Sequence, residues 1–290
     1  VLFTLPFRQG FTVGDCGDYL CAANQLNHGN WDILHNFYAT RIGTYLPYAL
    51  GMKLFGFGTW LTWLTTIELI LLLVLVYLSL RKVNPSIALL SSILLGTAPI
   101  VLQYSSMAMG DIASTLCSNA VILIIFYFRF YIQKTKTNAI IWGIATAMAF
   151  FTAFLVKESV VFFVPFILFN YWQTRKDLPY RPYWKYTIVT LTMLLTLLLI
   201  AYWVKTGNPF YKIMAVENGP TASDCNYAGT GWPSILNRVT WQPFQFITEN
   251  FTFSFLFLFA TLQAFQYRSD SSAHEKFFHH YYMMSIAMWW

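Results

Sequence analysis

The stretch that decides the fold is WLTWLTTIELILLLVLVYLSL at positions 60–80, which Arg81 and Lys82 follow at once. It is about 20 residues long, the length at which an α-helix crosses the hydrocarbon core of a bilayer. Glu68 is its only charged residue. The stretch therefore predicts a transmembrane helix over Trp60–Leu80.

Similar apolar runs recur along the rest of the chain and predict about eight membrane-embedded segments in an all-α, polytopic transmembrane protein. A porin-like barrel would need strands of alternating hydrophobicity, and these runs do not alternate. We expect one transmembrane domain over residues 1–290, read as a fragment because both ends lie in apolar runs. The further segments are Ser86–Gln103, Asp111–Tyr131, Asn138–Val156, Ser159–Trp172, Tyr186–Val204, Glu249–Tyr267 and Phe277–Trp290.

The composition excludes most soluble classes. Hydrophobic residues make up 57% of the chain and charged residues 10%, whereas soluble domains carry about 25% charged residues. The net charge of +6 could suggest a nucleic-acid partner. No basic stripe or recognition motif accompanies it, so we expect no nucleic acid. The four cysteines form no CxxC pair and thus no zinc or redox motif.

The basic residues predict the orientation. Eleven of the 18 fall in short loops that lie on one side if residues 8–58 lie on the other, and the positive-inside rule makes that side cytoplasmic. Two long loops, Arg8–Gly58 and Lys205–Thr248, would then share the outer face. The eleven are Arg81, Lys82, Arg129, Lys134, Lys136, Arg175, Lys176, Arg181, Lys185, Arg268 and Lys276.

The first outer loop predicts two short surface helices. Asp18–His28 suits a helix that stops at Gly29. Arg41–Phe55 suits an interfacial helix that is broken near Pro47, since its aromatic residues and lysine fit a membrane surface.

Carboxylates at the outer face are the first candidates for chemistry. Asp15 and Asp18 lie in GDCGDY, and Asp111 begins a predicted span. An acid at a membrane edge beside apolar walls can act as a general base or a metal ligand. The alternatives are a solvated loop for Asp15 and Asp18, and a carboxylate favoured by the helix dipole for Asp111.

Two basic residues are candidates for phosphate binding. Lys157 could hold a lipid phosphate as a point charge, and Arg41 could bind one bidentately. The alternatives are a local Lys157–Glu158 ion pair or a snorkelling lysine, and interfacial anchoring by Arg41. Glu68 lies inside a span among threonines that could hydrogen-bond it, and a proton relay would need more such acids.

Five motifs in order resemble those of glycosyltransferase family 39, from Gly14 to about Tyr211. The first, at 14–32, has an acid followed by a tyrosine four residues on; the third joins a proline and small residues to an aspartate. The five are GDCGDYLCAANQLNHGNWD (14–32), RIGTYLPYALGMKLFGFG (41–58), TAPIVLQYSSMAMGD (97–111), FLVKES (154–159) and TGNPFY (206–211).

The resemblance implies the fold of the C-superfamily of membrane glycosyltransferases. Such enzymes move a sugar from a polyprenyl-phosphate donor to a lipid, glycan or protein acceptor at the outer face, here expected to be that of a bacterial inner (cell) membrane. Asp15 would then be the general base or would organise the acceptor, with Asp111 as the second acid. Arg41, Lys157 and Tyr19 would bind substrate.

The resemblance has one departure in the first loop. Many members of the family carry Asp-Glu there, and Cys16 stands at the position of the glutamate. Asp18 is the alternative candidate for that role. No cofactor is required, although a divalent metal is left open.

Two rival functions remain. One is a catalytically silent relative that serves as a structural subunit beside other membrane subunits, which Cys16 favours and the retained Asp15, Asp111 and Lys157 disfavour. The other is a transporter, which would need polar residues inside several spans. In the enzyme we expect Asp15 and Asp111 to approach each other across an outward cavity.

Overall fold

The computed structural model describes residues 15–31, 33–34, 37–82, 84–107, 110–217 and 273–289, and in these residues every regular element is a helix. They divide into two compact units. The first is Val1–Val161 with Phe169–Lys212, and the second is Phe162–Leu168 with Ile213–Trp290. The prediction of an all-α protein is confirmed for the described residues.

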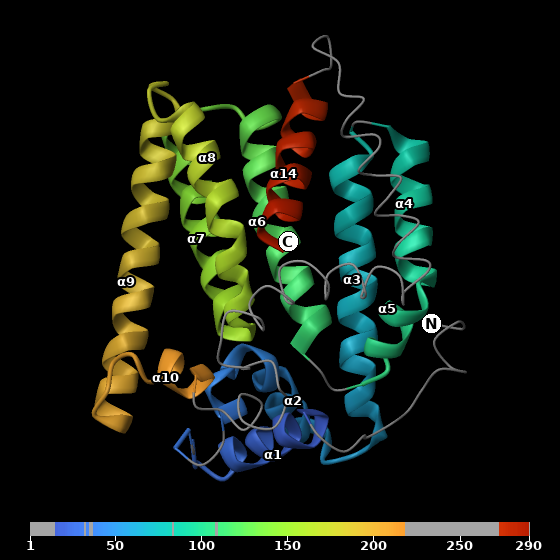
Figure 1. The fold of residues 1–290 in the computed structure, drawn as a ribbon, viewed down its shortest axis with the longest axis vertical. Coiled ribbons are helices and arrows are strands. Elements are labelled where there is room, and N and C mark those ends of the chain that lie inside the picture. Colours follow the sequence, from blue (N-terminus) through green and yellow to red (C-terminus); the bar gives the residue numbers. More distant parts are fainter. Residues whose placement is uncertain are drawn as a thin grey trace, which may run out of the picture. The chain divides into compact units, whose positions relative to one another are not determined.

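Among the described residues of the first unit, four helices are long and apolar enough to cross a membrane: α3 (Thr62–Leu80), α6 (Gly110–Phe130), α7 (Lys136–Val156) and α9 (Tyr180–Thr206). In Figure 1, α3, α6 and α7 stand side by side with α9 next to α7. Only 22% of the most apolar window of α3 and 11% of that of α9 is buried. Apolar surface of this extent suits contact with lipid far better than contact with water.

The predicted span Ser86–Gln103 is wrong as a single helix. It consists of α4 (Pro85–Thr97) and α5 (Pro99–Tyr104). Ala98 between them is extended, with ψ at 124°, because the ring of a following proline disfavours the helical conformation. At the start of α4, the Asn84 side chain accepts hydrogen bonds from two backbone N–H groups and caps the helix.

The predicted segment Ser159–Trp172 is also not a single α-helix. A 3₁₀ helix (Glu158–Phe163) precedes α8 (Val164–Thr174), whose 11 residues would reach about 16 Å. The span predicted over Tyr186–Val204 starts earlier, because α9 begins at Tyr180. Gly207 ends α9 with a φ of +74°, the left-handed conformation that glycine adopts without strain.

Small residues bring α7 close to α9. Ala139, Gly143 and Ala147 recur every fourth position on α7, and all three are buried. A Cβ atom on Gly143 would lie 2.5 Å from the carbonyl oxygen of Tyr183. This is the small-residue packing by which membrane helices approach each other closely.

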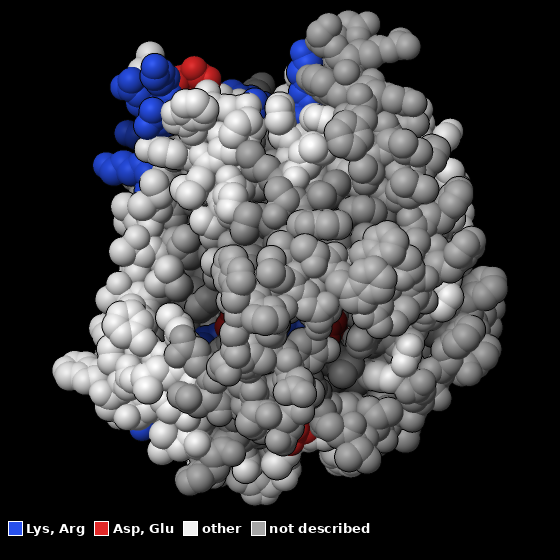
Figure 2. All heavy atoms as spheres, viewed as in Figure 1, with Lys and Arg blue, Asp and Glu red and all other residues white. Residues whose placement is uncertain are grey.

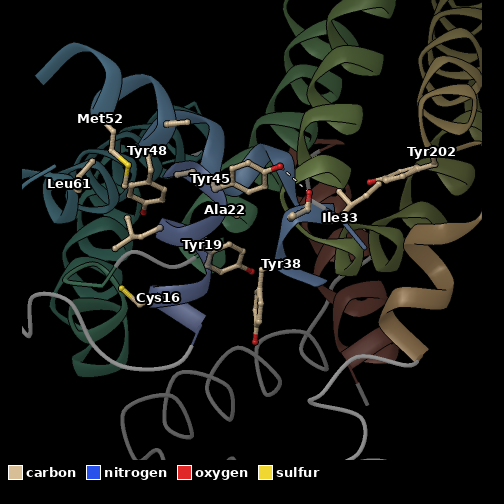
Figure 3. Packing of buried hydrophobic residues seen from close by; sticks show 14 residues of the cluster. Cys16, Tyr19, Ala22, Ile33, Tyr38, Tyr45, Tyr48, Met52, Leu61 and Tyr202 are labelled. Atoms are coloured by element: carbon tan, nitrogen blue, oxygen red, sulfur yellow. Dashed lines mark hydrogen bonds between the residues drawn. The ribbon is translucent and has the colours of Figure 1, made fainter. Parts of the chain in front are cut away.

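Short helices close one end of the first unit, here called the α1–α2 end. These are α1 (Asp15–Asn27), a 3₁₀ helix (Phe37–Thr40) and α2 (Ile42–Phe55), and they share an apolar core to which Tyr202 of α9 contributes (Figure 3). The two short helices predicted in the first outer loop are confirmed in outline as helices. However, α2 continues through Pro47 instead of breaking there.

Basic residues gather at the other end of this unit, as Figure 2 shows over the turn between α8 and α9. Arg175, Lys176 and Arg181 are exposed in and just after that turn. The remaining described helices are a short 3₁₀ helix (Thr59–Leu61), α10 (Tyr211–Glu217) and α14 (Ala273–Trp289). The span predicted over Glu249–Tyr267 lies outside the described residues.

Candidate functional site

The backbone before α2 is held by tyrosine hydroxyl groups. Tyr45 donates a hydrogen bond to the carbonyl of Ala39 at 2.9 Å, and Tyr202 donates one to the carbonyl of Thr40 at 3.0 Å. Figure 3 shows both tyrosines in the core of the α1–α2 end. Arg41 follows directly, so its backbone is fixed between α1, α2 and α9.

The Arg41 cluster consists of Tyr19, Arg41, Glu158 and Lys212. The Nε of Arg41 donates to Glu158 Oε2 at 3.0 Å, and its Nη1 donates to the Tyr19 hydroxyl at 2.9 Å. Lys212 Nζ lies 3.4 Å from Glu158 Oε1 and donates to the carbonyl of Phe154 at 2.8 Å. One carboxylate thus joins two cations that are far apart in the sequence.

Burial shapes the charges of this cluster. The side chain of Lys212 is 4% exposed, and that of Arg41 is 14% exposed. Burial lowers the pKa of Lys212 to about 8, although Glu158 opposes the shift and Arg41 adds to it. For Arg41, burial alone would lower the pKa, but Tyr19 and Glu158 outweigh it and the pKa is raised.

A second ion pair joins Lys157 to Asp111. Lys157 Nζ lies 2.5 Å from Asp111 Oδ1, and the two side chains are 32% and 42% exposed. Asp111 is in the first turn of α6, where a carboxylate also interacts favourably with the helix dipole. The alternative of a carboxylate favoured by the helix dipole therefore describes the position of Asp111 correctly, but it leaves out the ion pair with Lys157.

Close backbone contacts bring the two ion pairs together. A Cβ on Gly43 of α2 would lie 2.7 Å from the Val156 nitrogen, and Thr44 donates a hydrogen bond to the Val156 carbonyl at 2.8 Å. A Cβ on Gly110 would lie 2.6 Å from the hydroxyl oxygen of Thr44. The starts of α2 and α6 and the end of α7 therefore meet at one point.

Four of the six sequence-predicted site residues pair within this region: Tyr19 with Arg41, and Lys157 with Asp111. Asp18 is exposed on α1. The alternative of an ion pair inside the Lys157–Glu158 dipeptide is wrong, because each residue pairs with a different helix end.

The structure describes the side chain at only one of the two first-loop positions Asp15 and Cys16. Asp15 begins α1, but its side chain lies outside the described residues, as does its predicted approach to Asp111. Cys16 is fully buried in the core of the α1–α2 end. A glutamate there would place a carboxylate among apolar side chains, at a cost of several kcal/mol unless it were paired.

Sequence reasoning considered Glu158 only as an alternative partner of Lys157 and did not consider Lys212. The TGNPFY match stops at Tyr211, one residue short of Lys212. A lysine just beyond a motif, in a chain with 10% charged residues, is a signal that could have found it.

A divalent metal was left open by the sequence. Within the described part of the chain, no three or more His, Cys, Asp or Glu side chains group in a way that could hold a metal ion. The Arg41 cluster presents two cationic side chains to one carboxylate, a donor set that does not suit a cation.

Glu68 lies inside α3. Of the neighbouring threonines that could hydrogen-bond it, Thr65 and Thr66 instead donate to the carbonyls of Met107 and Ser105. Among the residues that the structure describes, Glu68 Oε2 is buried and has no hydrogen-bond partner.

The chain matches no protein-family model, no curated protein and no solved structure to which it was compared.

Proposed function

We propose that the chain is a membrane glycosyltransferase that moves a sugar from a polyprenyl-phosphate donor to a lipid, glycan or protein acceptor. The observation that carries the proposal is the meeting of Arg41, Asp111 and Lys157, which are far apart in the sequence, at the α1–α2 end of the span-length helices. Guanidinium and ammonium groups are the side chains that bind phosphate.

The surroundings of the site favour a donor that arrives from lipid. Leu46, Leu50 and Leu54 form an exposed apolar stripe along α2, with exposures of 40%, 55% and 73%. The stripe begins one turn after Arg41. A polyprenyl chain could lie against such a surface while its phosphate reaches the cations, which a soluble sugar nucleotide would not require.

The chemistry needs little beyond positioning. The acceptor hydroxyl attacks the anomeric carbon, its proton passes to a carboxylate, and the bond to the phosphate oxygen breaks so that polyprenyl phosphate leaves. Asp111, partly exposed beside Lys157, and Asp15 are our candidates for the base. Arg41 and Lys157 would stabilise the charge on the leaving phosphate.

The test is sugar transfer by the protein in lipid nanodiscs, from a labelled polyprenyl-phosphate sugar. We expect Asp111→Asn and Asp15→Asn to lose about 10²–10⁴-fold in rate. Asp177→Asn is the matched control, since Asp177 is an exposed acid in the α8–α9 turn. Wild-type rates in both site variants would refute the assignment.

The silent-subunit alternative has one observation in its favour. Arg41, Asp111, Lys157, Glu158 and Lys212 all have partners inside the protein, as structural ion pairs do. A wild-type protein that transfers no sugar from any polyprenyl-phosphate donor, yet co-purifies with other membrane subunits, would establish that reading.

A further inference from the structure

Lys212 is the second residue of α10, and its side chain lies inside the protein at 4% exposure. We propose that Lys212 is a positioning residue, which holds the Glu158 carboxylate in the orientation that fixes the Arg41 guanidinium. The inference rests on the proposed function in one respect, namely that Arg41 faces a phosphate.

Glu158 is the link through which Lys212 would act. Its Oε2 accepts from Arg41 Nε at 3.0 Å, and its Oε1 lies 3.4 Å from both that nitrogen and Lys212 Nζ. Two cations that pair with the same carboxylate restrict its rotation. Without Lys212, only Arg41 would restrain it among these three side chains.

The cost of burying Lys212 argues against a packing role alone. A buried ammonium group is costly unless it is well paired, and an apolar side chain of similar length often packs more favourably in its place. Lys212 also donates to the Phe154 carbonyl and lies 4.6 Å from the Phe154 ring centroid. These contacts hold the ammonium group in place, 3.4 Å from Glu158.

The charge state of Lys212 supports the same role. Burial lowers its pKa to about 8, and the charged groups that act on it in the described part of the chain are Glu158 and Arg41. The cluster therefore loses a positive charge at mildly alkaline pH. A lipid phosphate monoester is already fully charged there, because its second pKa is about 6.

The test measures binding of a polyprenyl phosphate to the protein in nanodiscs from pH 7 to 9.5, with the unphosphorylated polyprenol as reference. We expect the wild type to lose affinity about tenfold above pH 8, the size of one charge-assisted hydrogen bond. Lys212→Met should bind about tenfold more weakly at pH 7 with no change near pH 8. Lys212→Arg should keep its affinity throughout. Lys205→Met, at an exposed position near the end of α9, is the matched control and should behave as the wild type.

A double-mutant cycle tests whether Lys212 acts through Glu158. The double variant Lys212→Met/Glu158→Gln should bind no more weakly than Glu158→Gln alone. The reason is that Glu158→Gln already removes the carboxylate through which Lys212 would act. Additive losses, or equal losses in Lys212→Met and Lys212→Arg, would overturn the inference in favour of packing.

Hydrogen exchange separates this inference from the proposed function. If the wild type binds the phosphate and the polyprenol equally, the phosphate site is refuted. The positioning role of Lys212 is then tested by the rate of amide hydrogen exchange in residues 156–160. Relative to the wild type, this rate should be faster in Lys212→Met and unchanged in Lys212→Arg. Unchanged exchange in Lys212→Met would refute the positioning role.

Discussion

At the scale of single residues, the Lys157–Glu158 dipeptide explains how one short motif serves two helix ends. Lys157 is extended, with φ at −154° and ψ at 138°, and successive side chains of extended backbone point in opposite directions. Lys157 thus pairs with Asp111, and Glu158 pairs with Arg41 and Lys212. A helical backbone here would have placed both side chains closer to one face.

The buried Lys212 makes stability depend on pH. Its pKa is about 8 in the folded protein and 10.5 for the free side chain. Between these values the unfolded chain binds more protons, so stability should rise with pH. We expect the wild type to gain on the order of 2 kcal/mol between pH 8 and 10.

Thermal unfolding of the detergent-solubilised protein measures this effect, with Lys212→Met as the reference variant that should show no such rise. The window ends near pH 10 because burial raises the pKa of Tyr45 and Tyr48, which reverses the trend at higher pH. A wild-type unfolding temperature that falls from pH 8 to 10, relative to Lys212→Met, would contradict the prediction.

At the scale of elements, the contact of α7 with α9 depends on the absence of a side chain at Gly143. The Cβ atom of an alanine there would lie 2.5 Å from the Tyr183 carbonyl oxygen and 3.3 Å from the Thr187 nitrogen. The neighbours are backbone atoms, so the helices must separate to admit it. We expect Gly143→Ala to lower the free energy of unfolding by about 1–3 kcal/mol.

Gly17→Ala is the matched control for that substitution. Gly17 is an exposed residue of α1, and nothing lies within 4 Å of its added Cβ. Alanine is the better helix former, so this variant should gain about 0.5–1 kcal/mol. Equal unfolding temperatures for the two variants would show that the α7–α9 contact is looser than the structure has it.

At the scale of the whole molecule, the orientation predicted from the basic residues can be tested on the first unit. Lys53 on α2 and Lys205 on α9 are exposed, as is Lys176 in the α8–α9 turn. We expect an impermeant maleimide to label cysteines at positions 53 and 205 from the same side of the membrane, and one at 176 from the other side.

The labelling uses a background in which serine replaces the exposed native Cys21 and also Cys225, which lies in the long loop that is predicted to be outside. A cysteine at position 148 is the negative control, because Met148 is exposed near the middle of α7, where we expect lipid. Labelling of positions 53 and 205 from opposite sides would refute the predicted orientation.

The sequence by itself determined where long apolar helices form, because length and hydropathy are properties of contiguous residues. Thr62–Leu80, Gly110–Phe130 and Lys136–Val156 lie within two residues of their predicted bounds. Local reasoning failed where proline and 3₁₀ geometry decide, as at Ala98 and at residues 158–163. Hydropathy does not register such breaks.

Only the tertiary structure decided which charges meet. The sequence singled out Arg41, Asp111 and Lys157 and supplied Glu158 beside them, but their partners depend on which helix ends touch. Gly43, Thr44 and Gly110 bring those ends together through contacts too close for larger side chains. Ion pairs between distant residues follow from that packing, and no local pattern encodes it.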